Sequence, residues 1–98
     1  MPWFVKHEMF TPEVADLSIE QRRPYLEAHR RWVNHQASEG RSIRSGFLVD
    51  SSRRPGGGGL LIFEADSYDD ALSLVKQDPM ITAGLVTWTL QEWRVVSP

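Results

Sequence analysis

The sequence contains no cysteine, which excludes disulfide bonds and every thiolate-based mechanism. No apolar run approaches the roughly 20 residues that span a bilayer. The N-terminal residues MPWFVKHEMF lack the apolar stretch of a signal peptide. We therefore expect a cytoplasmic protein without a membrane partner.

The chain also lacks a marked excess of charge of either sign. Eleven basic and thirteen acidic residues give a formal net charge of −2, whereas nucleic-acid-binding domains carry a basic footprint. The basic residues are mostly arginines, and they include the adjacent pairs Arg22–Arg23, Arg30–Arg31 and Arg53–Arg54. Pairs scattered between acidic residues are typical of a solvated surface, so we expect no nucleic-acid partner.

Familiar phosphate-binding and nucleophile motifs are absent as well. The four consecutive glycines, Gly56–Gly59, precede an apolar strand rather than the GK[ST] and helix of a phosphate-binding loop. No nucleophile elbow is present. His7 and His29 are not separated by a short spacing typical of metal ligands. A metal site made of these two histidines and a carboxylate nevertheless stays open as the rival interpretation. We expect neither a metal nor a cofactor.

What the sequence does contain is a regular succession of six elements: strand, helix, strand, strand, helix, strand. We place the main helix from about Pro24 to Gly40, since a helix begun at the Ser18–Gln21 capping box would carry Pro24 too deep. Residues 51–59 are expected to form a flexible hairpin loop. Asp78–Pro79 should stop the second helix, which Ser67 caps. The strands are expected at residues 3–10, 42–50, 60–65 and 86–96.

The first strand alternates strictly between two sets of side chains. One face carries residues 3, 5, 7 and 9, and the other carries Phe4, Lys6, Glu8 and Phe10. Because both faces include aromatic residues, the strand should be covered on both sides and central in its sheet.

The order of elements predicts one domain, residues 1–98, with a ferredoxin-like α+β fold. Two interleaved βαβ units give a four-stranded antiparallel sheet with two helices on one face. The opposite face is then a bare apolar surface, which we expect Trp88, Trp93 and the aromatic residues of the first strand to line. Such a surface is most simply covered by a second copy, so we expect a homodimer.

The main helix carries an apolar stripe with a histidine in it. Leu26, His29, Val33 and Ala37 recur at spacings of three and four, so they share one helix face. His29 is therefore either a hydrogen-bonded core histidine or a buried acid–base group, and both interpretations stay open. The flanking residues are Tyr25 and Trp32, and His35 is expected in solvent.

Several features in order along the chain resemble the YciI-like family, a branch of the dimeric α+β barrel superfamily. The resemblance covers nearly the whole chain. The residues that carry it are His29, Glu39–Gly40, Ser45–Gly46, the glycine-rich hairpin before LLIFEA, Ser67 with Asp69, Asp70 and Ala71, Asp78–Pro79, Gly84 and Trp93.

The resemblance implies a small homodimer whose pocket holds a histidine and an aspartate that act together. In this sequence the two residues are His29 and Asp78. It also implies a cofactor-independent isomerase, lyase or dehydrochlorinase that acts on hydroxylated or chlorinated aromatic rings. Leu26 stands where the family often has arginine, and Phe47 where it has proline, so the substrate is left open.

We expect His29 to shuttle a proton in an isomerisation or elimination and Asp78 to orient it. The alternatives are packing roles for these residues, a non-catalytic dimer that binds a small hydrophobic ligand or serves as an accessory, and protein interaction through the outer helix faces. The remaining substrate-binding candidates are Tyr25 and Trp32 as apolar walls, and Ser45 and His7 as polar contacts.

Overall fold

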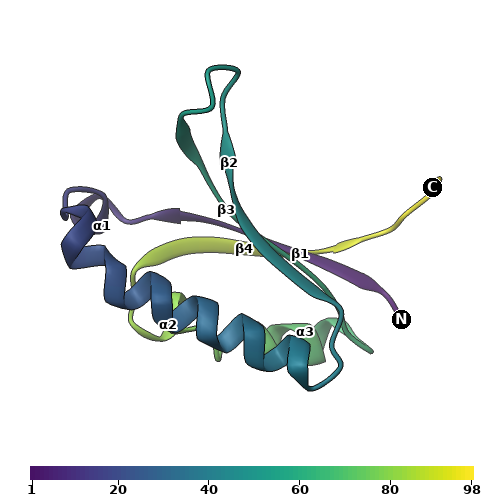
Figure 1. Cartoon of the computed structure of the whole chain (residues 1–98). Coiled ribbons are helices and arrows are strands. Elements are labelled where there is room, and N and C mark those ends of the chain that lie inside the picture. Colours follow the sequence, from purple (N-terminus) through teal and green to yellow (C-terminus); the bar gives the residue numbers. More distant parts are fainter.

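The computed structural model describes all residues, 1–98. The four strands form one antiparallel sheet in the order β2-β3-β1-β4, and helices α2 and α3 lie on the same face of it (Figure 1). This confirms the ferredoxin-like α+β fold and the central place of β1. The elements are β1 (Trp3–Phe10), α1 (Pro12–Ala15), α2 (Ile19–Ser38), β2 (Ile43–Val49), β3 (Pro55–Glu64), α3 (Tyr68–Val75), α4 (Pro79–Thr82) and β4 (Val86–Trp93).

Helix α2 begins five residues before the predicted start at Pro24. The side chain of Ser18 accepts a hydrogen bond from the backbone of Gln21, and the Gln21 side chain accepts one from the backbone of Ser18. This capping box satisfies the first backbone donors, so the helix tolerates Pro24 in its second turn. Gly40, with φ of 94°, follows the helix end as predicted.

The glycine run belongs to β3, not to a flexible loop as predicted. Gly59 pairs with Glu8 of β1 and Phe47 of β2, and the β2–β3 register then shifts. Gly58 has φ of 88°, and a Cβ there would lie 2.3 Å from the carbonyl oxygen of Glu8. The strand therefore needs glycine here, because a side chain would prevent the close approach of β1.

The larger hydrophobic cluster lies between the sheet and α3. It combines residues of β1, β3, α3 and β4, among them the fully buried Phe4, Phe63 and Val75. A smaller cluster joins α1, α4 and the start of β4, where Val14, Met80 and Val86 meet. Helix α2 contributes no buried residue to either cluster.

The face of the sheet without helices carries Trp3, Val5 and Ile62, none of them fully buried. Trp93 lies opposite Trp3 on this face and is 48% exposed. Trp88, however, was wrongly assigned to it. Its cross-strand neighbour is Glu8, and it packs against both hydrophobic clusters under the helices. No helix has the length and apolar character of a membrane span.

Candidate functional site

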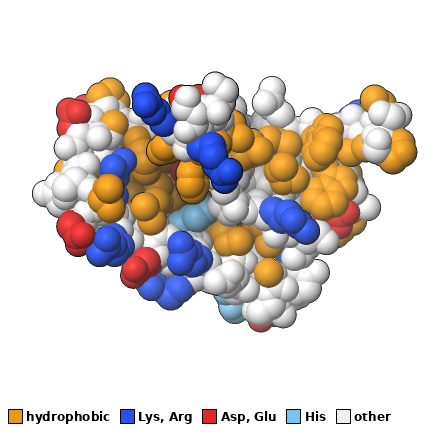
Figure 2. Space-filling view, turned by 45° about the horizontal axis from the view of Figure 1, so that its top comes forward, with side chains coloured by type: hydrophobic (Ala, Val, Ile, Leu, Met, Phe, Trp, Pro, Cys, Tyr) orange, Lys and Arg blue, Asp and Glu red, His pale blue; other side chains and the backbone are white.

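A cavity of about 1170 Å³ separates α2 from strands β1, β2 and β3. The predicted stripe of α2 forms one wall, since Leu26, His29, Val33 and Ala37 all line the cavity. Figure 2 shows a histidine at the bottom of a hollow that is bordered by hydrophobic side chains and by basic side chains, which are drawn in blue. The stripe therefore borders an open cavity, and Val33 of the stripe also packs against the main hydrophobic cluster.

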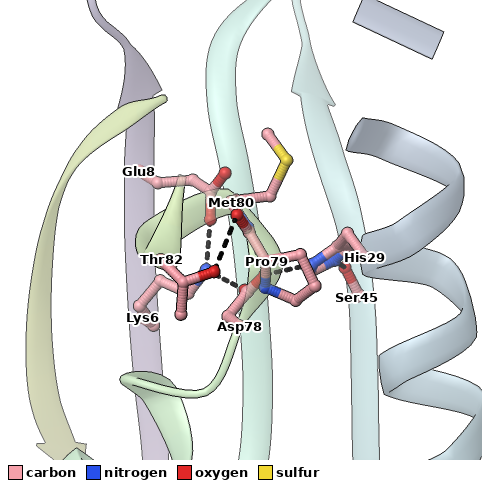
Figure 3. A network of polar contacts seen from close by, with 8 residues as sticks. All are labelled: Lys6, Glu8, His29, Ser45, Asp78, Pro79, Met80 and Thr82. Atoms are coloured by element: carbon pink, nitrogen blue, oxygen red, sulfur yellow. Dashed lines mark hydrogen bonds and ion pairs between the residues drawn. The ribbon is translucent and has the colours of Figure 1, made fainter. Parts of the chain in front are cut away.

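His29 makes hydrogen bonds through both ring nitrogens. Its Nδ1 lies 2.8 Å from Oδ1 of Asp78, and its Nε2 lies 2.7 Å from Oγ of Ser45. His29 and Ser45 line the cavity, whereas Asp78 lies behind the ring and is fully buried (Figure 3). The imidazole thus connects a buried carboxylate to an open space.

Asp78 is held in place by the start of a short helix. It is the N-cap of α4, and its Oδ1 accepts a hydrogen bond from the backbone N–H of Met80 at 3.0 Å. Pro79 occupies the first helical position, where its fixed φ favours this turn. The predicted helix stop therefore also directs the carboxylate toward His29.

A buried lysine from β1 completes the network. Nζ of Lys6 lies 2.8 Å from Oδ2 of Asp78 and also donates to Oε1 of Glu8 (Figure 3). Burial by itself would raise the pKa of the Asp78 carboxyl, but the hydrogen bond from His29 and the charge of Lys6 together lower it below its ordinary value. Asp78 is therefore ionised at neutral pH.

The ionised carboxylate determines the tautomer of His29. Because Asp78 can only accept, Nδ1 must carry the hydrogen, and in the neutral ring Nε2 then accepts from the Ser45 hydroxyl. The network holds one lysine against two carboxylates, so a proton taken up at Nε2 would balance its charge. Chemically, this is the arrangement of a general base oriented by a carboxylate.

The structure brings Ser45 to the predicted pair but not the other three candidates. His7 lies on the opposite face of the sheet, where its Nε2 is 2.8 Å from the carbonyl oxygen of Gly57. Trp32 packs against the core, its ring centroid 6.2 Å from that of His29, and Tyr25 is 40% exposed. Neither aromatic residue lines the cavity. A metal site built on His7 and His29 is not assembled within this chain.

The roles of Lys6 and Glu8 were not predicted from the sequence, although a signal was present. Two opposite charges stand at positions i and i+2 on one face of a strand predicted to be central. Charges in such a place are buried, and buried charges need partners. The alternation therefore indicated an ion pair, and only the partner Asp78 could not be foreseen.

Comparison with known proteins agrees with this fold. A family model described as the YCII-related domain matches residues 3–94. A solved structure of a 5-chloro-2-hydroxyhydroquinone dehydrochlorinase from Burkholderia phenoliruptrix AC1100, in complex with 2,5-dihydroxybenzoquinone, superposes with a TM-score of 0.69 at 23% identity over 94% of this chain and 93% of that one. The Arabidopsis thaliana protein At3g17210 gives 0.59 at 13% identity over 100% and 98%. No curated protein matches.

Proposed function

Because the chain belongs to the YCII-related domain family, we propose that it is a cofactor-independent enzyme that transfers a proton on a small cyclic or aromatic substrate. His29 is the acid–base group and Asp78 orients it. The observation that carries the proposal is the pair of hydrogen bonds on His29, one to a buried ionised carboxylate and one at the cavity wall.

The proposed step begins when a substrate hydroxyl replaces the hydroxyl of Ser45 at Nε2 of His29. Nε2 removes the proton, and the electron pair of the broken O–H bond forms a C=O bond. Electrons displaced within the ring move a double bond and, where the leaving group is on a saturated carbon next to that bond, expel it, for example as chloride. In an aromatic ring the carbon that bears the leaving group first becomes saturated by taking up the proton from His29, and removal of the proton of a second hydroxyl then expels the group. Asp78 stabilises the resulting imidazolium, which returns the proton to the product or to water.

The test is a matched pair of histidine substitutions on the same helix. His29→Gln and His35→Gln would be assayed against phenols, lactones and chlorinated hydroquinones, beginning with 5-chloro-2-hydroxyhydroquinone, by absorbance and chloride release. We expect His29→Gln to lower turnover by about 10² to 10⁴-fold, and His35→Gln, exposed and outside the cavity, to leave it unchanged. Equal turnover by the two variants would refute the proposal.

The bare face of the sheet supports a second part of the proposal, a homodimer formed by sheet-to-sheet packing. Trp3, Ile62 and Trp93 are apolar side chains on this face, and an apolar surface of this kind favours a partner. In sedimentation at micromolar concentration we expect the wild-type chain to be dimeric and Ile62→Arg to be monomeric. A monomeric wild type contradicts the dimer but not the proton transfer.

A further inference from the structure

Two arginines of α2 line the cavity, and each has an arginine neighbour that does not. Arg22 and Arg30 belong to the cavity wall, whereas Arg23 and Arg31, next to them in sequence, lie outside it. The adjacent pairs that resembled a uniform solvated surface are therefore divided by the helix, with one member of each pair turned to the void.

The two α2 arginines that line the cavity have no acidic partner in the chain. Neither forms a salt bridge, whereas Arg23 pairs with Glu20 at 3.1 Å. Nε of Arg22 is buried without any hydrogen-bond partner. A buried donor is normally satisfied, and no group of this chain accepts from this nitrogen, so it is available to an acceptor from outside the chain.

The orientation of Arg22 is supported by an aromatic side chain. Its guanidinium carbon lies 5.3 Å from the ring centroid of Phe10, which also lines the cavity. A guanidinium placed over a ring keeps the N–H groups at its edge available for a planar acceptor. Arg22 is thus pre-organised for a bidentate contact.

The charges in the cavity favour an anion, although the chain as a whole is slightly acidic. The only carboxylate in the lining is that of Glu8, which shares the charge of Lys6 with the buried Asp78, so these three groups carry one net negative charge. Three arginines line the same cavity, Arg22 and Arg30 of α2 and Arg44 of β2, and none of them forms a salt bridge. Positive charge therefore exceeds negative charge in the lining. Within such walls a charge pair is screened less than in water.

We propose that the cavity takes an organic acid, with its carboxylate on Arg22 and its ring or hydroxyl group at His29 and Ser45. This inference rests on the function proposed above, and it names the substrate class of the same site. The planar fork of arginine matches a carboxylate in two parallel hydrogen bonds. The apolar remainder of the lining, including Leu26 and Val33 between the two ends, suits the hydrocarbon body of the acid.

The spacing on the helix limits the length of this acid. Arg22 precedes His29 by two turns, which corresponds to about 10 Å along the helix axis. A single ring with its acid group directly attached is shorter than this separation, whereas a ring with a short acid side chain spans it. We therefore expect affinity to increase when the carboxylate is moved away from the ring.

Isothermal titration calorimetry with defined probes tests the inference. The probes are 4-hydroxybenzoate, 4-hydroxyphenylacetate and 3-(4-hydroxyphenyl)propionate, each compared with its uncharged amide. We expect the best acid to bind at least about ten-fold more tightly than its amide, and Arg22→Gln to remove that preference. The matched variant Arg23→Gln, with the same change of charge on the same helix, should retain it. Arg30→Gln should weaken acid binding by a smaller factor.

The outcomes test the ligand class and the proton transfer separately. Failure of the acids to bind, equal binding of acids and amides, or equal effects of Arg22→Gln and Arg23→Gln would overturn the inference, provided that each variant melts like the wild type. His29→Gln separates this result from the proposed function, because it should lose turnover while it keeps the preference for acid over amide, which depends on Arg22. Acid binding through Arg22 without any turnover would keep the ligand class and refute the proton transfer.

Discussion

Helices α2 and α3 cover the same face of the sheet but bury very different amounts of side chain. Helix α3 has eight residues and buries Ala71, Leu74 and Val75 in the main core, whereas the twenty residues of α2 include none that is buried. One half of the space between helices and sheet is therefore packed, and the other half is hollow.

The difference separates the half that stabilises the fold from the half that leaves space beside His29. The packed half supplies the apolar burial on which folding depends, and the hollow half leaves room for a ligand beside His29. The ion network of Lys6, Glu8 and Asp78 lies at the border between them. A rigid core thus holds the carboxylate, while the imidazole that it orients faces open space.

The strongest test of this comparison uses two phenylalanines on neighbouring strands. Phe63 is fully buried in the core, whereas Phe47 lines the cavity and is 70% exposed. We expect Phe63→Ala to lower the free energy of unfolding by about 4 kcal/mol and Phe47→Ala to change it by less than about 0.5 kcal/mol. Urea denaturation measures both. Similar losses would show that the cavity side also supports the fold.

Substitution of the two lysines of the chain tests whether the ion network between the packed and the hollow half stabilises the fold. Lys6→Met leaves Asp78 and Glu8 buried without their cation, and breaking a buried ion pair costs about 3 kcal/mol of stability. Lys76→Met removes an exposed lysine just after α3 and should be nearly neutral. The measurement is again urea denaturation at pH 7, and an equally stable Lys6→Met variant would contradict a structural role for the pair.

The smallest expected effect concerns pH. In the folded protein the pKa of Asp78 lies below its ordinary value of 3.8, so between these two values the unfolded chain binds more protons and stability rises with pH. The contribution of the ionised carboxylate is complete above about pH 5 and is lost as the pH falls through the folded pKa.

Asp78→Asn lacks this titration. At pH 7 we expect the variant to be less stable than the wild type by about 2 kcal/mol, because charge-assisted hydrogen bonds are lost. The difference should narrow below about pH 4, which a series of urea midpoints between neutral and acidic pH would reveal. If the difference in stability between the wild type and Asp78→Asn does not change with pH, Asp78 stabilises the fold by packing and not by its charge.

Local patterns predicted much of the fold. Alternation in residues 3–10 identified a central strand and the face that each side chain occupies, and helical spacing identified the stripe that contains His29. Propensity alone was misleading where tertiary contacts prevailed. Pro24 lies inside α2, and Gly56–Gly59 form part of β3, because capping and strand pairing outweigh the preferences of single residues.

The candidate site was predictable only in part. His29 was predicted as a site residue from its position in the helical stripe, and Asp78 was paired with it by resemblance to the family. Periodicity could not place Asp78 beside His29, because the two residues are 49 positions apart in the sequence. Lys6, which is 72 residues from Asp78, was visible only as a charge on a buried face. Arg22 lines the cavity and Arg23 does not. This difference depends on the rotation of α2 about its axis, which is determined by the elements that the helix packs against.

By itself, the order of residues determined the strands, most of the helical stripe and the caps, because these depend on hydrogen bonds and side-chain spacing within a few positions. The tertiary structure alone decided that the stripe faces a void and that a lysine, an aspartate, a histidine and a serine meet at its edge. Convergence of that kind depends on the packing of β1, β2, α2 and α4 together, and no local period along the chain encodes the distances between them.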